Sequence, residues 1–245
     1  MGHFFRAETD GYVFKAMSPI HIITLITLVF GIIAIIYLYK NNRNLLKPIS
    51  KFLFIALIIE QISLYAWYFF VLGFDPVQAL PLYSCRIAML SIIFGKLLKS
   101  DSLLLFGGYF GFPGGVIALA YPYLDAYSFP HLTNFTFFLG HLLLTWLCTI
   151  ILLEKKEQKK QLKGMLIWVH VFFIITYFVD INYGANYAYL LWSPIMTSTF
   201  AKIPHFLYIA LIYFVYVVIL LLTHLGFKKL RSLRDTNREA FNNIF

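Results

Sequence analysis

At residues 18–39 the chain reads SPIHIITLITLVFGIIAIIYLY, a run in which His21 is the only ionisable group apart from tyrosine. A helix needs about 20 mostly apolar residues to cross a bilayer, so this run predicts a membrane-spanning helix. Further apolar stretches follow at residues 50–72, 79–98, 102–121, 131–153, 164–181 and 202–225. We therefore expect an all-α, polytopic membrane protein with seven transmembrane helices.

The stretch at 102–121 is the weakest of the seven. Its centre reads GGYFGFPGG at residues 107–115, and glycine and proline are the poorest helix formers. This composition favours a broken or kinked helix, which a membrane protein tolerates where neighbouring helices satisfy the freed backbone groups.

The composition of the whole chain agrees with a membrane protein. Of the 245 residues, 60% are hydrophobic and only 13% are charged, whereas soluble domains average about 45–50% apolar and about 25% charged residues. A soluble enzyme, a disordered chain and a nucleic-acid-binding domain are therefore excluded. The two cysteines, Cys85 and Cys148, are too few for a disulfide framework.

The basic residues indicate the topology. Sixteen of the 20 Lys and Arg residues lie within residues 40–51, 96–99, 155–163 and 228–238. Positive residues favour cytoplasmic loops, which predicts an external N-terminus and a cytoplasmic C-terminus and requires an odd number of spans. We expect an extracellular segment at 1–17, a membrane domain at 18–225 and a basic cytoplasmic tail at 226–245. The net charge of +9 is then a topology signal, and no nucleic-acid partner is expected.

Ionisable groups inside spanning helices are costly, so each is a functional candidate. The candidates are His21, Glu60, Cys85, Arg86, His141, His170, Asp180 and His205. Most of them fall in the outer half of the predicted bundle, as does the polar segment that contains Asn186 and Tyr187. Each also has a simpler interpretation, because a buried cysteine is usually inert packing and a buried histidine often forms only an interhelical hydrogen bond.

Cys85 and His141 form the sharpest candidate pair. A thiol becomes a nucleophile when a base removes its proton or a nearby cation stabilises the thiolate. His141 is the candidate base. Arg86 is a neighbouring cation, which could instead reach lipid phosphates or hold a substrate phosphate.

Four short motifs in order resemble a known family. They are Leu80-Pro81-Leu82-Tyr83-Ser84-Cys85-Arg86, a histidine at the start of the first helix (Ser18-Pro19-Ile20-His21), Phe137-Phe138-Leu139-Gly140-His141 and Gly184-Ala185-Asn186-Tyr187-Ala188-Tyr189-Leu190. Together they resemble the YwaF-like integral membrane proteins of bacteria, whose eukaryotic relative is transmembrane protein 164. The resemblance covers about residues 15–225.

The resemblance implies a seven-helix lipid acyltransferase or acyl hydrolase of the plasma membrane. Cys85 would take an acyl chain from an outer-leaflet phospholipid as a thioester, and a lysophospholipid would be an acceptor. His141 would be the general base and later the general acid. The substrate-binding candidates are Arg86, His21, Asn186, Tyr187, Glu60 and Asp180. No metal and no cofactor is expected.

Two other classes of function remain open at this stage. A transporter or lipid-binding protein would use a polar outer cavity, with Glu60, Asp180 and the histidines as coupling or substrate groups. A haem or quinone redox protein would use intramembrane histidines such as His141 and His170 as ligands. A visible absorption band would identify the haem protein.

Overall fold

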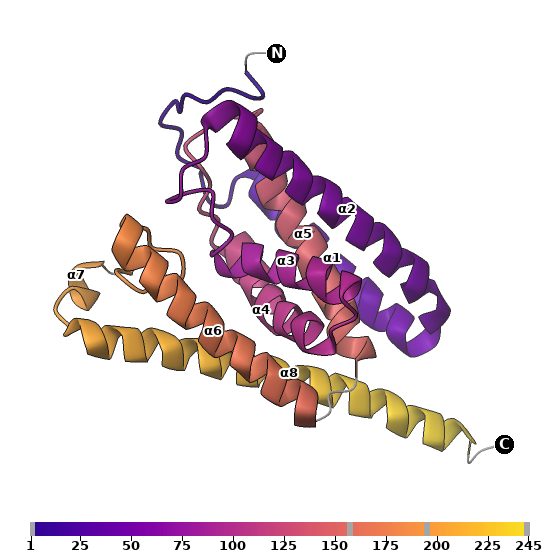
Figure 1. Ribbon diagram of the computed structural model, residues 1–245. Coiled ribbons are helices and arrows are strands. Elements are labelled where there is room, and N and C mark those ends of the chain that lie inside the picture. Colours follow the sequence, from indigo (N-terminus) through magenta and orange to yellow (C-terminus); the bar gives the residue numbers. More distant parts are fainter. Residues whose placement is uncertain (1–2, 156–158, 194–196, 243–245) are drawn as a thin grey trace.

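The computed structural model describes residues 3–155, 159–193 and 197–242, which form helices and connecting loops only (Figure 1). The elements are α1 (Pro19–Asn41), η1 (Arg43–Leu45), α2 (Leu46–Trp67), a π-helical turn η2 (Tyr68–Leu72), α3 (Ser84–Leu97), α4 (Asp101–Ala120), α5 (Leu132–Glu154), α6 (Lys159–Tyr183), α7 (Thr197–Phe200) and α8 (His205–Asn242).

Within the described residues, six helical segments are long and apolar enough to cross a membrane. They are α1, α2 with its flanking turns, α4, α5, α6 and α8 as far as Ser232. The chain is therefore a multi-pass membrane protein, as its hydropathy predicts. The stretch predicted at 79–98 corresponds to α3, which has only 14 residues and a length of about 21 Å. The predicted tail from residue 226 continues α8 as far as Asn242, and residues 243–245 lie outside the described part of the chain.

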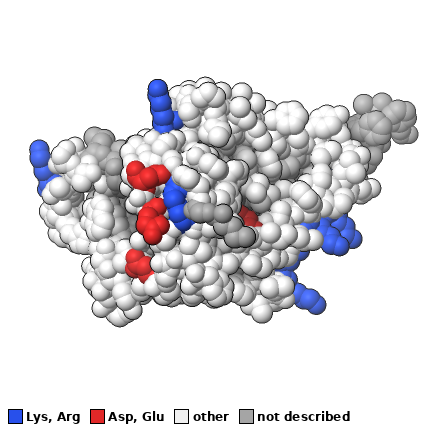
Figure 2. Space-filling model, turned by 90° about the horizontal axis from the view of Figure 1, so that it is seen from above, with Lys and Arg blue, Asp and Glu red and all other residues white. Residues whose placement is uncertain are grey.

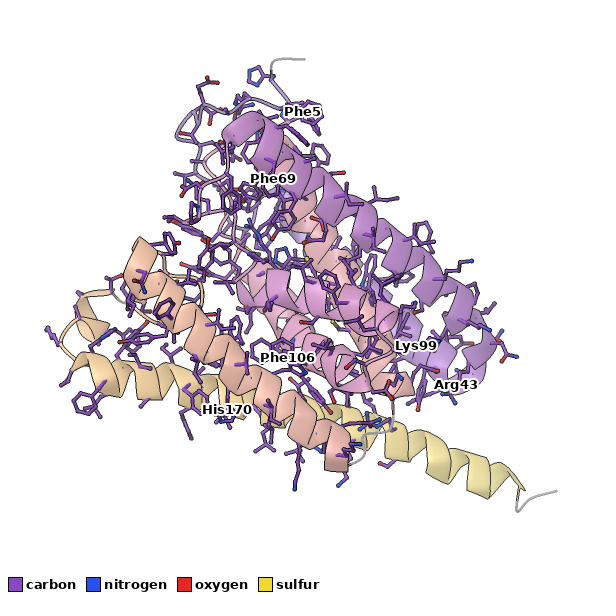
Figure 3. The ribbon with its side chains drawn as sticks, in the orientation of Figure 1. Phe5, Arg43, Phe69, Lys99, Phe106 and His170 are labelled. Atoms are coloured by element: carbon purple, nitrogen blue, oxygen red, sulfur yellow. The ribbon has the colours of Figure 1, made fainter. Side chains whose placement is uncertain are left out.

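The two ends of the bundle carry different loops. Arg43 forms an ion pair with Glu154, with Nε at 2.5 Å from the carboxylate, and Lys155 forms another with Asp101. These contacts bring the loops after α1, α3 and α5 together. In Figure 3, Arg43 and Lys99 lie at the end of the molecule opposite to Phe5 and Phe69. The chain termini also lie at opposite ends (Figure 1).

Helix α4 is one α-helix through its glycine-rich centre, and Pro113 lies inside it. The broken helix that the sequence favours is not observed, because the neighbouring helices pack closely against the glycines. A Cβ atom at Gly107 would lie 2.9 Å from the Ala88 carbonyl oxygen of α3, and one at Gly111 would lie 2.6 Å from the Cys148 sulfur of α5. The glycines thus allow α3 and α5 to approach the backbone of α4.

Polar side chains connect α8 to the other helices. The Tyr109 hydroxyl of α4 is 2.9 Å from Nδ1 of His224, and the Tyr213 hydroxyl donates to Nε2 of His170 on α6 at 2.9 Å. In Figure 3, His170 lies on α6 beside α8. Hydrogen bonds between helices replace those to water inside a bilayer, so these pairs help to place α8.

An extended N-terminal strap, residues 4–10, lies across the loop between α4 and α5. Its carbonyl groups accept hydrogen bonds from Leu132 N, His131 Nε2, Tyr127 Oη and the Trp67 indole at 2.8–3.2 Å. Arg6 and Asp10 pair with each other at 2.7 Å. Seen from above, the face in Figure 2 is mostly uncharged, and Asp and Glu side chains gather in one part of it.

Candidate functional site

Cys85 is the second residue of α3, and its side chain faces α4. A Cβ atom at Gly114 would lie 3.1 Å from the Cys85 sulfur and 3.8 Å from the Ser84 hydroxyl oxygen. These two side-chain atoms are themselves 4.0 Å apart. The missing side chain of Gly114 therefore leaves the space that the thiol and the hydroxyl face.

His141 approaches the next residue of α4. Its backbone carbonyl oxygen would lie 3.2 Å from a Cβ atom at Gly115, so the Cys85 thiol and the His141 backbone pack against consecutive residues of α4. Nδ1 of His141 lies 2.6 Å from the Phe137 carbonyl. A carbonyl can only accept, so Nδ1 carries the proton and Nε2 holds a lone pair. Among the described residues, the hydrogen bond of His141 uses Nδ1 and not Nε2, so the Nε2 lone pair is able to accept a proton.

Arg86 is held firmly beside this pair. Its guanidinium donates to the Gln78 carbonyl at 2.7 Å and to the Tyr68 hydroxyl at 2.5 Å. It also stacks over the rings of Tyr68 and Tyr83, at 5.0 and 5.1 Å from their centroids. Arg86 directly follows Cys85 in α3. A fixed positive charge near a thiol favours the thiolate.

Two acidic residues share the neighbourhood of Arg86. Burial raises the pKa of Asp125, in the loop between α4 and α5, and the Arg86 charge opposes that rise. The buried Glu60 of α2 accepts a hydrogen bond from Gln61 at 2.8 Å, and its carboxyl carbon would lie 3.0 Å from a Cβ atom at Gly140. Glu60 therefore lies against the residue that precedes His141.

His21 joins two helix ends. The Met17 N–H donates to its Nδ1 at 2.9 Å, and its Nε2 donates to the Leu119 carbonyl at 2.8 Å. Both ring nitrogens are thus occupied by the backbone. His21 thus links the start of α1 to the end of α4, and neither of these two hydrogen bonds involves Cys85. Its predicted role in substrate binding stays a prediction.

Asp180, Asn186 and Tyr187 shape the loop after α6. Asp180 accepts from the Tyr187 N–H at 3.0 Å, and Asn186 accepts from the Leu191 N–H at 3.0 Å. The Tyr187 hydroxyl donates to the Pro76 carbonyl and accepts from the Leu80 N–H at 3.2 Å. These residues connect the loop to the segment that leads into Cys85, and their predicted contact with substrate stays a prediction.

The other intramembrane candidates have partners of their own. His170 is exposed and uses both ring nitrogens, because Nδ1 also donates to the Leu166 carbonyl at 2.6 Å. His205 donates to the Leu190 carbonyl at 3.1 Å. Cys148 is fully buried and approaches the Gly107 carbonyl at 3.6 Å. These contacts give each of the three side chains a structural role, either in packing or in a hydrogen bond between elements.

The structure adds three residues that sequence reasoning does not select. Tyr216 of α8 packs against Phe110 of α4, with ring centroids 5.7 Å apart. Tyr189, in the loop after α6, has a φ of +57°, which a non-glycine residue rarely adopts. Gly114 opens the space at the thiol. Gly114 could have been noticed within the glycine-rich stretch, whereas Tyr216 is one of 17 tyrosines without a distinguishing pattern.

Comparison with known proteins identifies a family model that matches most of the chain. The model of the TMEM164 family matches residues 16–225, which include every helix from α1 to α7 and the part of α8 that carries Tyr216. No curated protein and no solved structure matches the chain. The matched range covers most of the chain and all of the candidate site, and the chain therefore belongs to the TMEM164 family.

Proposed function

We propose that this protein is a cysteine-dependent phospholipid acyltransferase or acyl hydrolase. One observation carries the proposal: the Cys85 thiol faces Gly114 of α4, and the backbone of His141, whose Nε2 has no hydrogen bond among the described residues, packs against the next residue, Gly115. Acyl transfer requires a nucleophile and a base close to the substrate ester, and Cys85 and His141 are the residues proposed for these roles. The resemblance of residues 80–86 and 137–141 to the YwaF-like proteins supports the same chemistry.

The first half-reaction forms a thioester. Nε2 of His141 accepts the thiol proton, and the Cys85 sulfur attacks the carbonyl carbon of a phospholipid ester. A C–S bond forms as the ester C–O bond breaks. The proton on Nε2 then passes to the departing glycerol oxygen, which leaves a lysophospholipid and an acylated Cys85.

The second half-reaction releases the acyl chain. The hydroxyl group of a lysophospholipid, or water, gives its proton to Nε2 and attacks the thioester carbon. The C–S bond breaks and the proton returns to the sulfur. Arg86 would stabilise negative charge during both steps, and Glu60 would line the polar wall beside His141. The apolar surroundings would slow hydrolysis of the thioester relative to transfer.

The topology belongs to the same proposal. We propose seven crossings of a bacterial plasma membrane, with α3 as a short span enclosed by protein, the N-terminus outside and the C-terminus in the cytoplasm. The termini at opposite ends of the bundle and the shared end of the basic loops support this arrangement. An impermeant maleimide should label Glu8→Cys in intact cells, whereas Lys99→Cys should need permeabilised cells. The reverse pattern would invert the topology.

The chemistry is tested by trapping the intermediate. Purified protein is incubated with phospholipid that carries a labelled acyl chain, then denatured, and Cys85 is expected to retain the label until hydroxylamine releases it. Cys85→Ala should abolish labelling, and His141→Gln should reduce it by at least about 10²-fold, the usual contribution of a general base. Cys148→Ala removes the other thiol and should leave turnover intact. Wild-type turnover in Cys85→Ala would refute the proposal, and substrate flux that is insensitive to this change would favour a transporter.

A further inference from the structure

The segment before α3, residues 73–83, consists of turns and bends and leads directly to Cys85. Cys85 is the second residue of α3, and Tyr83 precedes the helix as its N-cap. The Tyr83 side chain makes no capping hydrogen bond to the described residues of α3. Because helix ends fray and a capping side chain opposes this, the position of the Cys85 thiol depends on what holds the segment before α3.

One buried hydroxyl from the loop after α6 holds the backbone of this segment at two points. The Tyr187 hydroxyl donates to the Pro76 carbonyl and accepts from the Leu80 N–H at 3.2 Å. Tyr187 is only 1% exposed, so these bonds replace those that the hydroxyl would otherwise make to water. A hydroxyl has a single proton, and here the Pro76 carbonyl accepts it. Pro76 and Leu80 are thereby held on either side of one oxygen atom.

The Tyr187 ring makes a separate contact with the start of α3. It packs edge to face against the Tyr83 ring, with ring centroids 4.8 Å apart. The Arg86 guanidinium lies over the same Tyr83 ring at 5.1 Å and donates to the Gln78 carbonyl at 2.7 Å. Tyr83 and Arg86 stand on either side of Cys85 in the sequence. The contacts that begin at Tyr187 therefore reach the chain both before and after the thiol.

Tyr187 is itself fixed to α6. The buried Asp180 of α6 accepts a hydrogen bond from the Tyr187 N–H at 3.0 Å. Tyr187 also packs in a small hydrophobic cluster with Leu82 and Ala185. Because the backbone and the ring of Tyr187 have these contacts of their own, removal of the hydroxyl alone should leave the ring in place.

We propose that Tyr187 is a positioning residue for Cys85. Its hydroxyl holds the backbone of residues 76–80 and its ring holds Tyr83, so that the first turn of α3 directs the Cys85 thiol toward Gly114. Tyr187 acts on acyl transfer through the placement of the thiol. This role deepens the proposed function and rests on it for its effect on turnover, whereas the effect on the segment before α3 requires no lipid.

Tyr187→Phe tests the hydroxyl and keeps the ring. In full-length protein in detergent, the Leu80 amide loses its acceptor, and residues 76–84 should exchange their amide hydrogens about threefold to tenfold faster. Iodoacetamide should also alkylate Cys85 about threefold to tenfold faster, because the first turn of α3 opens more often. Peptide mass spectrometry quantifies both changes and reads the fully buried Cys148 separately. Faster alkylation of Cys148 as well as Cys85 would show a general loosening of the bundle and would count against the proposal.

Tyr208→Phe is the matched control. Tyr208 of α8 is also a buried tyrosine, and its hydroxyl donates to the Tyr189 carbonyl in the loop after α6 at 2.5 Å. The control removes a hydrogen bond from the same loop and leaves both hydroxyl bonds of Tyr187 in place. Amide exchange at 76–84 and the alkylation rate of Cys85 should stay at their wild-type values. Equal changes in the two variants, or wild-type exchange in Tyr187→Phe, would overturn the proposal.

Turnover separates a positioning role from a contact with substrate. With the labelled phospholipid in mixed micelles, Tyr187→Phe should lower kcat by about 10- to 100-fold and change KM by less than about twofold, because a displaced thiol attacks more slowly while the lipid still binds. A raised KM with an unchanged kcat would identify Tyr187 as a substrate contact and overturn the proposal. If the wild-type protein shows no acyl turnover, the proposed function fails, and amide exchange and alkylation decide the positioning of Cys85 by themselves.

Discussion

Gly107→Ala tests whether close packing on α4 stabilises the bundle. The added Cβ atom would lie 2.9 Å from the Ala88 carbonyl oxygen and 3.1 Å from the Ile92 nitrogen, both backbone atoms of α3, whereas ordinary Cβ contacts begin at 3.4 Å. A side chain could rotate away, but α3 itself would have to shift by about 0.5 Å to relieve the shorter contact. Overpacking of this kind costs about 1–3 kcal/mol.

Gly226→Ala is the matched control. It lies on α8, where no atom comes within 4 Å of the added Cβ. Both substitutions gain the same helix propensity, roughly 0.5–1 kcal/mol, so the overpacking is what separates the two variants. With about 2–4 °C for each kcal/mol in a chain of this size, Gly107→Ala should melt roughly 2–12 °C below Gly226→Ala.

Scanning fluorimetry of the tryptophans in detergent measures this difference. Equal melting temperatures in the two variants would show that α3 and α4 separate without cost, and the packing argument would then be wrong. A second readout connects the packing to the site. Gly107 and Gly114 both face α3, so a shift of α3 at Gly107 should also change the alkylation rate of Cys85.

Three further predictions concern single residues. Hydrogen bonds from Ser128 hold the pKa of Asp10 below its ordinary value, which is ~3.9, so the carboxylate stabilises the N-terminal strap fully above about pH 4 and loses this effect as the pH falls further. Asp10→Asn should therefore speed amide exchange in the strap at pH 7, and the difference from wild type should narrow toward pH 2. Lys99 has a φ of +53° at the end of α3, so Lys99→Gly should raise the melting temperature, with a gain of about 0.5–1 kcal/mol; a lower temperature would contradict this. Arg86→Lys keeps the charge but loses the fork of hydrogen bonds, and should cost about 1.5–3 kcal/mol in chemical denaturation, whereas unchanged stability would show that the fork is dispensable.

The apolar stretches predict the helices because the thickness of a bilayer fixes the length of a spanning helix. The length of an apolar run cannot separate a helix from an apolar loop. This explains why the helix predicted at 79–98 begins only at Ser84. Residues 79–83 continue the apolar run but lie outside α3. The Leu80 N–H there donates to the Tyr187 hydroxyl, 107 residues away, and no local pattern reveals such a partner.

The candidate site, too, could be predicted from the sequence only in part. Cys85 and His141 can be selected from the sequence because reactive side chains are rare inside a membrane. The sequence cannot separate a reactive group from one that only connects helices, since every polar group in a bilayer needs a partner. His21 meets this need with the backbone on both ring nitrogens, whereas Nε2 of His141 has no hydrogen bond among the described residues. Only their positions in space distinguish the two histidines.

The five glycines of α4 connect the fold to the chemistry. Alanine would form a better helix at each of these positions, yet a side chain at Gly111 or Gly115 would collide with α5, and one at Gly114 would approach the Cys85 sulfur. The close approach that orders the bundle therefore also brings the Cys85 thiol and the His141 backbone to consecutive residues of α4. Substitutions at these glycines should change stability and Cys85 reactivity together. Measuring the melting temperature and the alkylation rate of Cys85 in each glycine variant would show whether the packing of α4 controls the surroundings of the thiol.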